Sequence, residues 1–177
     1  MKKVFILFLL ISSFSIQAQQ PPKMIKYNAK NVAGIFYYNL DEAVKKIKVK
    51  KEKVKFSTRK ALRAYNDKIK DISFLNSVKL STLETTINTL GDQLRQNRDL
   101  ALRVRKQIDS TILPIRDSIK NYEDTLNTKL ESILNSKQYK KWLKYQKKEK
   151  RKLLPKMPSR APQRSRMRGN RMGGRRF

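Results

Sequence analysis

Helix-breaking residues are almost absent from the middle of this chain, and that scarcity constrains its fold more than any other feature. Between Lys23 and Leu154 the sequence holds one proline, Pro114, and two glycines, Gly34 and Gly91. The same span is rich in lysine, leucine and arginine, which all have good helix propensity. We therefore expect an all-α fold built from long helices.

Apolar residues recur at the three- and four-residue spacing of amphipathic helices. This spacing predicts a short helix near residues 40–47, which Asn39 can cap, and a second helix over residues 54–72. A turn is expected within residues 72–80. A capping-box pattern at Ser81 then predicts the start of a long helix.

The expected long helix carries a heptad-like apolar seam. Its apolar members are Leu83, Ile87, Leu90, Leu94, Ala101, Val104, Ile108, Ile112, Ile115, Ile119, Tyr122, Leu126, Leu130 and Ile133. Gly91 lies inside the seam and costs about 1 kcal/mol relative to alanine. Asn97 also lies on the seam, either as a polar pairing device or as the exposed middle of a long hairpin.

The seam changes phase near Pro114, which predicts a kink there or, alternatively, a break with a new helix starting at the proline. A straight helical path from Ser81 to Leu134 would span about 80 Å. We therefore expect the chain to fold back at Pro114 or to pair along its length. The predicted architecture is a set of extended antiparallel helical hairpins with long, kinked helices.

The N-terminus has the pattern of a secretory signal peptide. Two lysines precede an apolar run over residues 4–11, and Ala18 provides a small residue before a cleavage point at Gln19. The apolar run is too short to span a bilayer. We expect residues 1–18 to be removed and the mature chain to be periplasmic, with secretion as the alternative.

Composition excludes several kinds of chemistry. The chain has 43 lysines and arginines against 14 acidic residues, a net charge of +29, and neither cysteine nor histidine. Thiol nucleophiles, imidazole bases and Cys/His zinc sites are therefore excluded. The few carboxylates stand mostly alone among cations, which keeps them ionised. We expect no enzyme activity and no cofactor, and a surface that attracts polyanions.

A lysine-rich run at residues 45–55 is a candidate client- or anion-binding surface. Seven lysines alternate there with Ile47, Val49 and Val54: Lys45, Lys46, Lys48, Lys50, Lys51, Lys53 and Lys55. In this hypothesis the cations attract acidic segments and exposed aliphatic side chains hold them. The alternative is a solvated corner between two helices.

Two aromatic groups are expected to pack in the core. Phe36, Tyr37 and Tyr38 would fold the N-terminal segment back on the hairpin, although a client-holding patch is the alternative. Trp142 and Tyr145 are three residues apart and share a helix face. We expect them to pack against the start of the hairpin.

A helix-joint motif follows the long seam. In the segment ILNSKQYKKW, residues 133–142, Leu134 is the apolar anchor, Asn135 can cap the next helix, and Gln138 can complete the capping box. This segment resembles the L-T-x-x-Q motif of the Spy/CpxP family of periplasmic proteins, with asparagine in place of threonine. The export signal, the size and the helical pattern are also similar to that family.

The resemblance implies a thin all-helical protein made of antiparallel hairpins, assigned here to residues 19–150. Such a protein would dimerise into a curved cradle with a basic, partly apolar concave face. It would hold unfolded or aggregation-prone envelope proteins without ATP. A sister branch of the family senses envelope stress by docking on a sensor kinase.

Residues 151–177 are dominated by arginine, proline and glycine, and we expect a disordered basic tail. Its partners would be lipopolysaccharide or anionic lipid, bound in a salt-dependent way. The export signal disfavours nucleic acid. Because the seams are thin, we also expect a homodimer. The leading functional hypothesis is an ATP-independent chaperone-like or stress-response protein; the alternative is an envelope structural or adaptor protein.

Overall fold

The computed structural model describes residues 25–155, and this part of the chain is all-helical, without a β-strand. Its helices are α2 (Ala29–Ala33), α3 (Leu40–Ile47), α4 (Glu52–Leu75), α5 (Ser77–Leu90), α6 (Gln93–Gln96), α7 (Arg98–Ile133) and α8 (Ser136–Arg151). The all-α expectation is confirmed. The expected signal peptide, its Ala18–Gln19 cleavage point and the tail beyond residue 155 lie outside the described residues.

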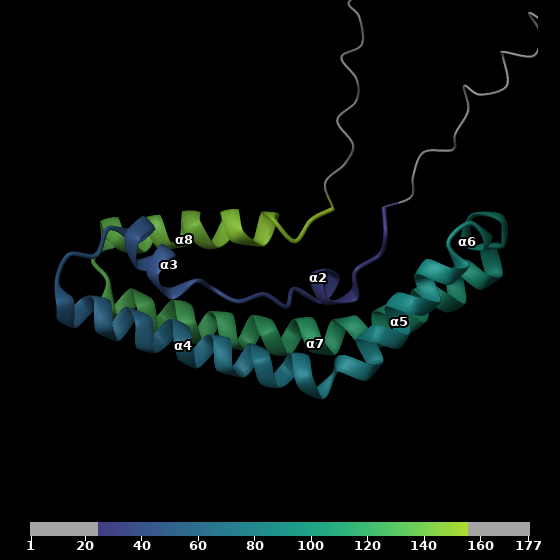
Figure 1. Cartoon of the computed structure of the whole chain (residues 1–177), viewed down its shortest axis with the longest axis horizontal. Helices are drawn as coiled ribbons and strands as arrows, with labels where there is room; N and C mark the ends of the chain where they lie inside the picture. Colours follow the sequence, from purple (N-terminus) through teal and green to yellow (C-terminus); the bar gives the residue numbers. More distant parts are fainter. Residues whose placement is uncertain (1–24, 156–177) are drawn as a thin grey trace, which may run out of the picture.

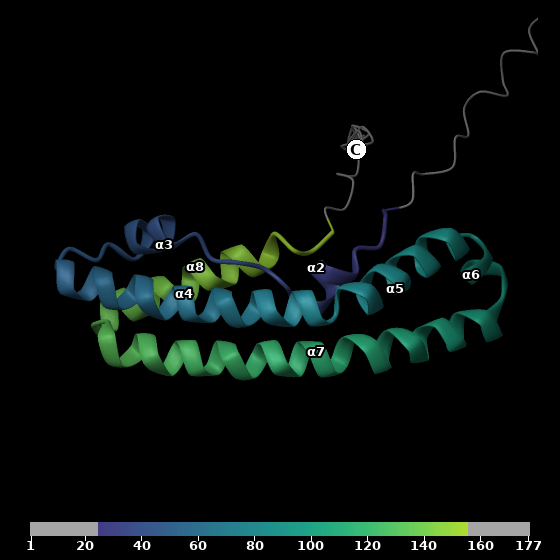
Figure 2. The same ribbon diagram turned by 60° about the horizontal axis from the view of Figure 1, so that its bottom comes forward.

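An extended antiparallel hairpin forms the body of the molecule (Figures 1 and 2). One arm consists of α4 followed by α5, and the other is the single long helix α7. Helices α3 and α8 cover one end of this hairpin, and α2 lies over its middle. The opposite end, residues 77–108, is contacted by α2 but not by α3 or α8; we call it the hairpin arm.

The chain reverses direction between α5 and α7, not at Pro114. Helix α5 ends just before Gly91, α6 makes a single turn, and Asn97 is the N-cap of α7. The Oδ1 atom of Asn97 accepts a hydrogen bond from the Leu100 N–H at 3.0 Å. The expected continuous seam through this region is therefore wrong. Glycine and asparagine end one helix and begin another here, which are their usual roles at helix termini.

Pro114 lies inside α7 without breaking it. Ile112 and Ile115 on either side are buried, whereas Pro114 and Ser110 are exposed. Proline has no N–H to donate to the Ser110 carbonyl, four residues earlier. Because that carbonyl is exposed, it can bind water instead. Figures 1 and 2 show α7 as a gently curved rod, so the expected kink, break and fold-back do not occur at this position.

Helices α4 and α5 meet at Asn76 with a bend and no loop. The Asn76 side chain donates to the Ile72 carbonyl at 2.9 Å, and the Ser77 hydroxyl donates to the Phe74 carbonyl at 2.7 Å. A turn was expected over residues 72–80, but only Asn76 interrupts the helices there. The capping box expected at Ser81 is wrong, because that residue lies inside α5.

The N-terminal segment is held along the hairpin by side chains that bind its backbone. Asn88 of α5 accepts from the Tyr27 N–H at 2.8 Å and donates to the Tyr27 carbonyl at 2.9 Å. Asn66 of α4 makes the same pair of bonds with Tyr38, at 3.0 and 2.8 Å. The amides thus satisfy backbone groups of an extended segment that has no strand partner.

The core is thickest where α3 and α8 cover the hairpin. Trp142 is completely buried, and its ring centroid lies 4.9 Å from that of Tyr38. Core packing is therefore confirmed for Tyr38 and Trp142. Tyr37, which was also expected in the core, is 51% exposed. Trp142 also donates to Asn127 at 2.8 Å, so it packs on the second half of α7 and not on the start of the hairpin as expected.

The buried face of α7 departs from the expected seam at one position. Ile119 and Leu126 are buried as expected, but Tyr122 is 37% exposed, and Glu123 takes the buried position between them. A four-residue step from Ile119 leads to Glu123, and a three-residue step leads to Leu126. A carboxylate therefore occupies the core position that the tyrosine was expected to fill.

Candidate functional site

The lysine-rich run forms a corner between α3 and α4. Helix α3 ends at Lys48, whose φ of 61° is in the left-handed region. Lys45, Lys46, Lys48, Lys50, Lys51 and Lys53 are exposed and Lys55 is half-buried. Ile47 and Val49 were expected to be exposed and to contact bound acidic segments. Only 0% and 5% of their surface is exposed. Ile47 and Val49 are therefore not the exposed aliphatic residues that were expected, and the exposed side chains of the run are mainly lysines.

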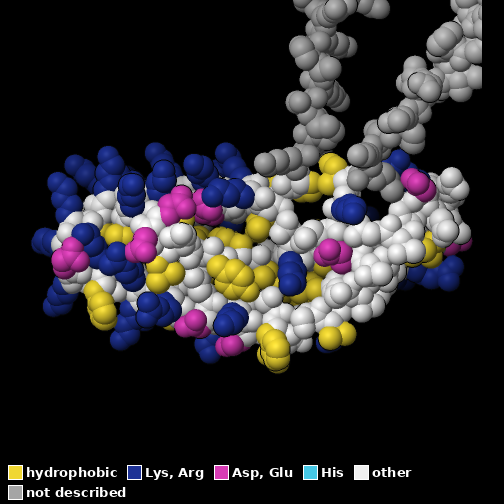
Figure 3. All heavy atoms as spheres, in the orientation of Figure 1, with side chains coloured by type: hydrophobic (Ala, Val, Ile, Leu, Met, Phe, Trp, Pro, Cys, Tyr) yellow, Lys and Arg dark blue, Asp and Glu magenta, His cyan; other side chains and the backbone are white. Residues whose placement is uncertain are grey.

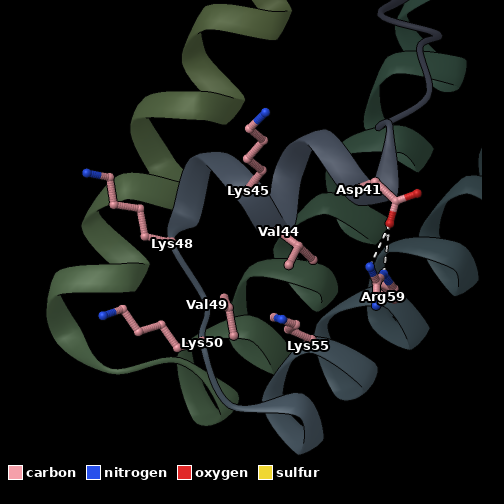
Figure 4. A pocket seen from close by; sticks show the side chains of 8 residues that line it. All are labelled: Asp41, Val44, Lys45, Lys48, Val49, Lys50, Lys55 and Arg59. Atoms are coloured by element: carbon pink, nitrogen blue, oxygen red, sulfur yellow. Dashed lines mark hydrogen bonds and ion pairs between the residues drawn. The ribbon is translucent and has the colours of Figure 1, made fainter.

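A shallow hollow of about 450 Å³ lies at this corner (Figure 4). Val44 and Val49 line it together with Lys45, Lys48, Lys50, Lys55, Asp41 and Arg59. Arg59 is bound to Asp41 at 2.8 Å, and Lys55 is bound to Glu52 at 2.5 Å. In Figure 4, Lys48 and Lys50 extend to the same side and Lys45 extends upward, so their ammonium groups do not meet at one point. Such an arrangement creates a positive surface potential but no converging anion pocket.

Helix α8 extends the positive surface. Its sequence has eight basic residues and one carboxylate, Glu149. The exposed lysines are Lys137, Lys140, Lys141, Lys144, Lys147, Lys148 and Lys150. We call the lysine-rich run and these α8 lysines together the basic layer. Figure 3 shows its dark-blue side chains crowding one edge of the molecule, over α3 and α8.

The helix-joint motif has the geometry predicted from the sequence. Asn135 accepts from the Gln138 N–H at 2.9 Å, and the Gln138 side chain accepts from the Asn135 N–H at 3.2 Å. Leu134 is buried, with 7% of its surface exposed. The motif therefore starts α8 and turns the chain back over α7, which places the basic layer. It is a structural joint with no converging polar groups of its own.

A polar cluster is buried beneath the basic layer. The Glu123 carboxylate, only 8% exposed, binds the Lys150 ammonium at 2.5 Å. Next to this pair, Asn127 Oδ1 accepts from both Trp142 at 2.8 Å and Gln146 at 3.2 Å. The carboxylate holds the core position that Tyr122 was expected to fill because α8 supplies a cation to it. Sequence periodicity could not reveal this pairing.

Burial also changes the acidity of the aromatic residues around this cluster. It raises the pKa of Tyr38 and of Tyr65 well above the ordinary value of 10.0, and the negative charge of Glu123 adds to both shifts. Burial raises the pKa of Tyr145 to about 12. These phenols therefore stay protonated at neutral pH, and they act as packing groups with a polar end.

A second hollow is a mainly apolar groove of about 1020 Å³. It lies between the N-terminal segment, the α5–α6 end of the hairpin arm and the residues that follow α8. Its lining includes Ile25, Tyr27, Val32, Ile87, Leu94, Leu153 and Leu154, and Lys26 is its one charged lining residue. Figure 3 shows the molecule hollowed on this edge, between its body and the hairpin arm.

No sequence motif indicated this groove. Its walls come from three segments that are far apart in the chain, near residues 25–32, 87–94 and 153–155. They meet only because the hairpin reverses after α5 and α8 folds back over α7. A reversal at Pro114, one of the two alternatives from the sequence, would have placed these walls elsewhere.

Within residues 25–155, no group of three or more acidic side chains lies close enough to hold a metal ion. None of the helices in this range combines the length and apolar character needed to cross a membrane. No protein-family model matches the chain, and no match was found among curated proteins or solved structures.

Proposed function

We propose that this is an exported, ATP-independent polypeptide-binding protein with a chaperone-like role toward unfolded or aggregation-prone envelope proteins. The observation that carries the proposal is the apolar groove, because a groove of about 1020 Å³ with one charged lining residue suits an apolar peptide segment. Large exposed apolar surfaces on soluble proteins commonly mark interaction sites.

The basic layer supports the same proposal by a different route. Positive surface charge speeds encounter with acidic segments and orients them, while apolar contacts supply most of the affinity. Groove and basic layer lie along the same edge of the molecule in Figure 3. A non-native chain that carries both apolar and acidic stretches would therefore contact both.

The test measures how well the purified protein suppresses aggregation of a chemically denatured model protein. Leu154→Asp places a charge in the groove at a residue that is 64% exposed, so folding is preserved. Leu113→Asp makes the same change at a 47% exposed residue on α7, outside the groove lining. We expect the first variant to lose most of its protection and the second to retain it. Equal protection by both variants would contradict the proposal.

An envelope adaptor that binds lipopolysaccharide or anionic membrane is the second candidate function. The observation in its favour is α8, whose exposed face carries lysines with a single carboxylate among them. Sedimentation with anionic vesicles, compared at low and high salt, tests this function because surface attraction is screened over about 10 Å at 0.1 M salt. Binding that needs low salt and survives Leu154→Asp would favour it over the polypeptide-binding role.

A further inference from the structure

The outward face of α4 is aromatic at both ends. Phe56 is 69% exposed and Phe74 is 78% exposed, although large aromatic side chains are usually buried. The two are 18 residues apart, which is five full turns, so they lie on one line along the helix, about 27 Å apart. The buried residues of α4, including Ala61 and Tyr65, lie on its opposite side. No helix of the described chain crosses in front of α4 in Figure 1 or Figure 2.

Charged residues occupy the line between the two phenylalanines. Arg63 and Asp67 lie close to it, and Lys60 and Asp71 lie along one flank; all four are exposed. We call these six residues the α4 face: Phe56, Lys60, Arg63, Asp67, Asp71 and Phe74. Along the helix axis, the positions of these residues are nearly symmetric about Tyr65. Phe56 and Phe74 are equally far from Tyr65 along the axis, and so are Arg63 and Asp67.

This symmetry has a direct consequence for a second copy of the helix placed antiparallel across a twofold axis. Phe56 of one copy would then lie opposite Phe74 of the other, and Arg63 would lie opposite Asp67 of the other. Lys60 would lie beside the other copy's Asp71, on the same flank and within one residue of the same height. Each pair occurs twice, as a twofold axis requires.

We propose that the α4 face is the interface of an antiparallel, twofold-symmetric homodimer of this chain. Its charge complementarity is to itself, which selects a second copy over an unrelated partner. Like charges also meet: Arg63 and Asp67 each lie about 6 Å along the axis from the same residue of the second copy, and Lys70 lies beside the second copy's Arg59. Asp41 already binds that arginine at 2.8 Å and offsets its charge. The interface leaves the groove and the α8 lysines of the basic layer free, because both lie on the edge of the molecule away from α4.

The expected dimer is reversible. A contact five helical turns long buries less surface than a standard stable protein interface, so we expect dissociation in the micromolar range. Aromatic pairs at both ends would supply most of the affinity. The opposed charges would fix the antiparallel register, as like charges placed face to face disfavour other arrangements.

Charge exchange tests the proposal in the full mature chain by sedimentation across the micromolar range. Arg63→Asp would set two carboxylates opposite each other and shift the equilibrium at least tenfold toward monomer. Lys68→Asp is the matched control, since it makes the same charge change on an exposed residue of α4 that lies about 120° around the helix from the line. The double exchange Arg63→Asp with Asp67→Arg should restore the dimer. A monomeric wild-type chain, or equal effects of Arg63→Asp and Lys68→Asp, would overturn the interface.

Cysteine pairing provides a second, independent test, because the chain has no cysteine of its own. A Phe56→Cys chain mixed with a Phe74→Cys chain should form a disulfide-linked heterodimer on mild oxidation. Either chain alone should link poorly, since equivalent residues would lie about 27 Å apart across the axis. Efficient self-linking of one variant would contradict the antiparallel arrangement. A third outcome is also informative. If the wild-type chain is monomeric and Phe74→Asp reduces its protection of a client protein, the α4 face binds clients and the dimer is rejected.

Discussion

The covered end of the hairpin and the hairpin arm are built from the same kind of helix but differ in how their apolar faces are covered. At the covered end, α3 and α8 form a third layer, and Trp142, Leu62 and Leu130 are fully buried. In the arm, α5 buries only Leu80 and Leu83, and α6 buries no residue. Periodicity specifies a helix in both regions, but only a third layer converts its apolar face into a core.

The comparison suggests a division of roles. The covered end supplies stability and holds the basic layer, while the arm leaves an apolar wall open as one side of the groove. Regions with few buried contacts open locally at low free-energy cost. A groove wall built there can change shape at low free-energy cost, as the proposed binding of different non-native segments would require.

The sharpest test of this contrast removes one large side chain from each region. Trp142→Ala deletes a fully buried indole and should lower the free energy of unfolding by about 3–5 kcal/mol. Leu94→Ala, at a half-buried residue of α6, should cost less than about 1 kcal/mol. Urea unfolding followed by circular dichroism measures both. Similar losses for the two variants would remove the distinction between the regions.

Two carboxylates extend the comparison to polar groups. Glu123 is buried at the covered end and binds Lys150, whereas half-buried Glu84 in the arm accepts the Ala29 N–H at 2.9 Å. Glu123→Gln leaves the ammonium without its counter-charge and should cost about 1–3 kcal/mol. Glu84→Gln keeps an acceptor oxygen and should cost less. Equal denaturation midpoints for the two variants would show that burial does not set the difference.

Two asparagine caps offer a subtler contrast, because Asn135 starts α8 and Asn97 starts α7. Replacing either by alanine should cost about 1 kcal/mol. The consequences should differ in extent: loss of the Asn135 cap weakens the docking of α8, so amide exchange should rise through the core. Loss of the Asn97 cap should raise exchange only near the hairpin turn. Hydrogen-exchange mass spectrometry distinguishes these patterns, and a global response to Asn97→Ala would show that the arm folds as one unit with the core.

The smallest expected effect is the pH dependence of two tyrosines. The pKa of Tyr65 and that of Tyr27 in the groove are both raised above 10.0, mainly by burial. The folded chain therefore binds these phenolic protons more tightly than the unfolded chain does. The resulting stability is fully present below pH 10 and is lost as the pH rises above it.

Tyr65→Phe should therefore flatten the loss of stability between about pH 8 and about pH 11, and Tyr27→Phe should flatten it less, because only the shift of Tyr65 is large. At neutral pH, Tyr65→Phe should be close to neutral, since the Tyr65 hydroxyl has no hydrogen-bond partner among the described residues. Urea titrations at each pH provide the measurement, and an unchanged slope for Tyr65→Phe would contradict the assignment.

Local signals in the sequence predicted local features well. The capping residues Asn39 and Asn135 both act as N-caps, and the apolar spacing over residues 54–72 marks the buried side of α4. Each of these features depends on residues within two turns of one another. Such short-range hydrogen bonding and periodicity are encoded in adjacent residues, so they can be recognised without knowing the tertiary structure.

The features that the sequence did not reveal depend on contacts between distant residues. A kink or a break was expected at Pro114, with fold-back there as one of two alternatives, yet the exposed position of the proline in α7 tolerates it and the helix pairs along its length with α4 and α5. Of the two alternatives for Asn97, the exposed middle of a long hairpin is the one observed, and its capping role could not be foreseen because it depends on where the chain reverses. Glu123 reached the core only because α8 brings Lys150 to it. The groove likewise depends on three separated segments meeting.

The contact between Tyr38 and Trp142 joins residues that are about 100 positions apart in the chain. During synthesis or transport from the N-terminus, the aromatic core would stay incomplete until α8 had followed the rest of the chain. Every shorter nascent form would expose the side of the hairpin that α8 later covers. We therefore expect folding to finish in a late step, and we expect chains truncated before Trp142 to be recognised as unfinished by proteases.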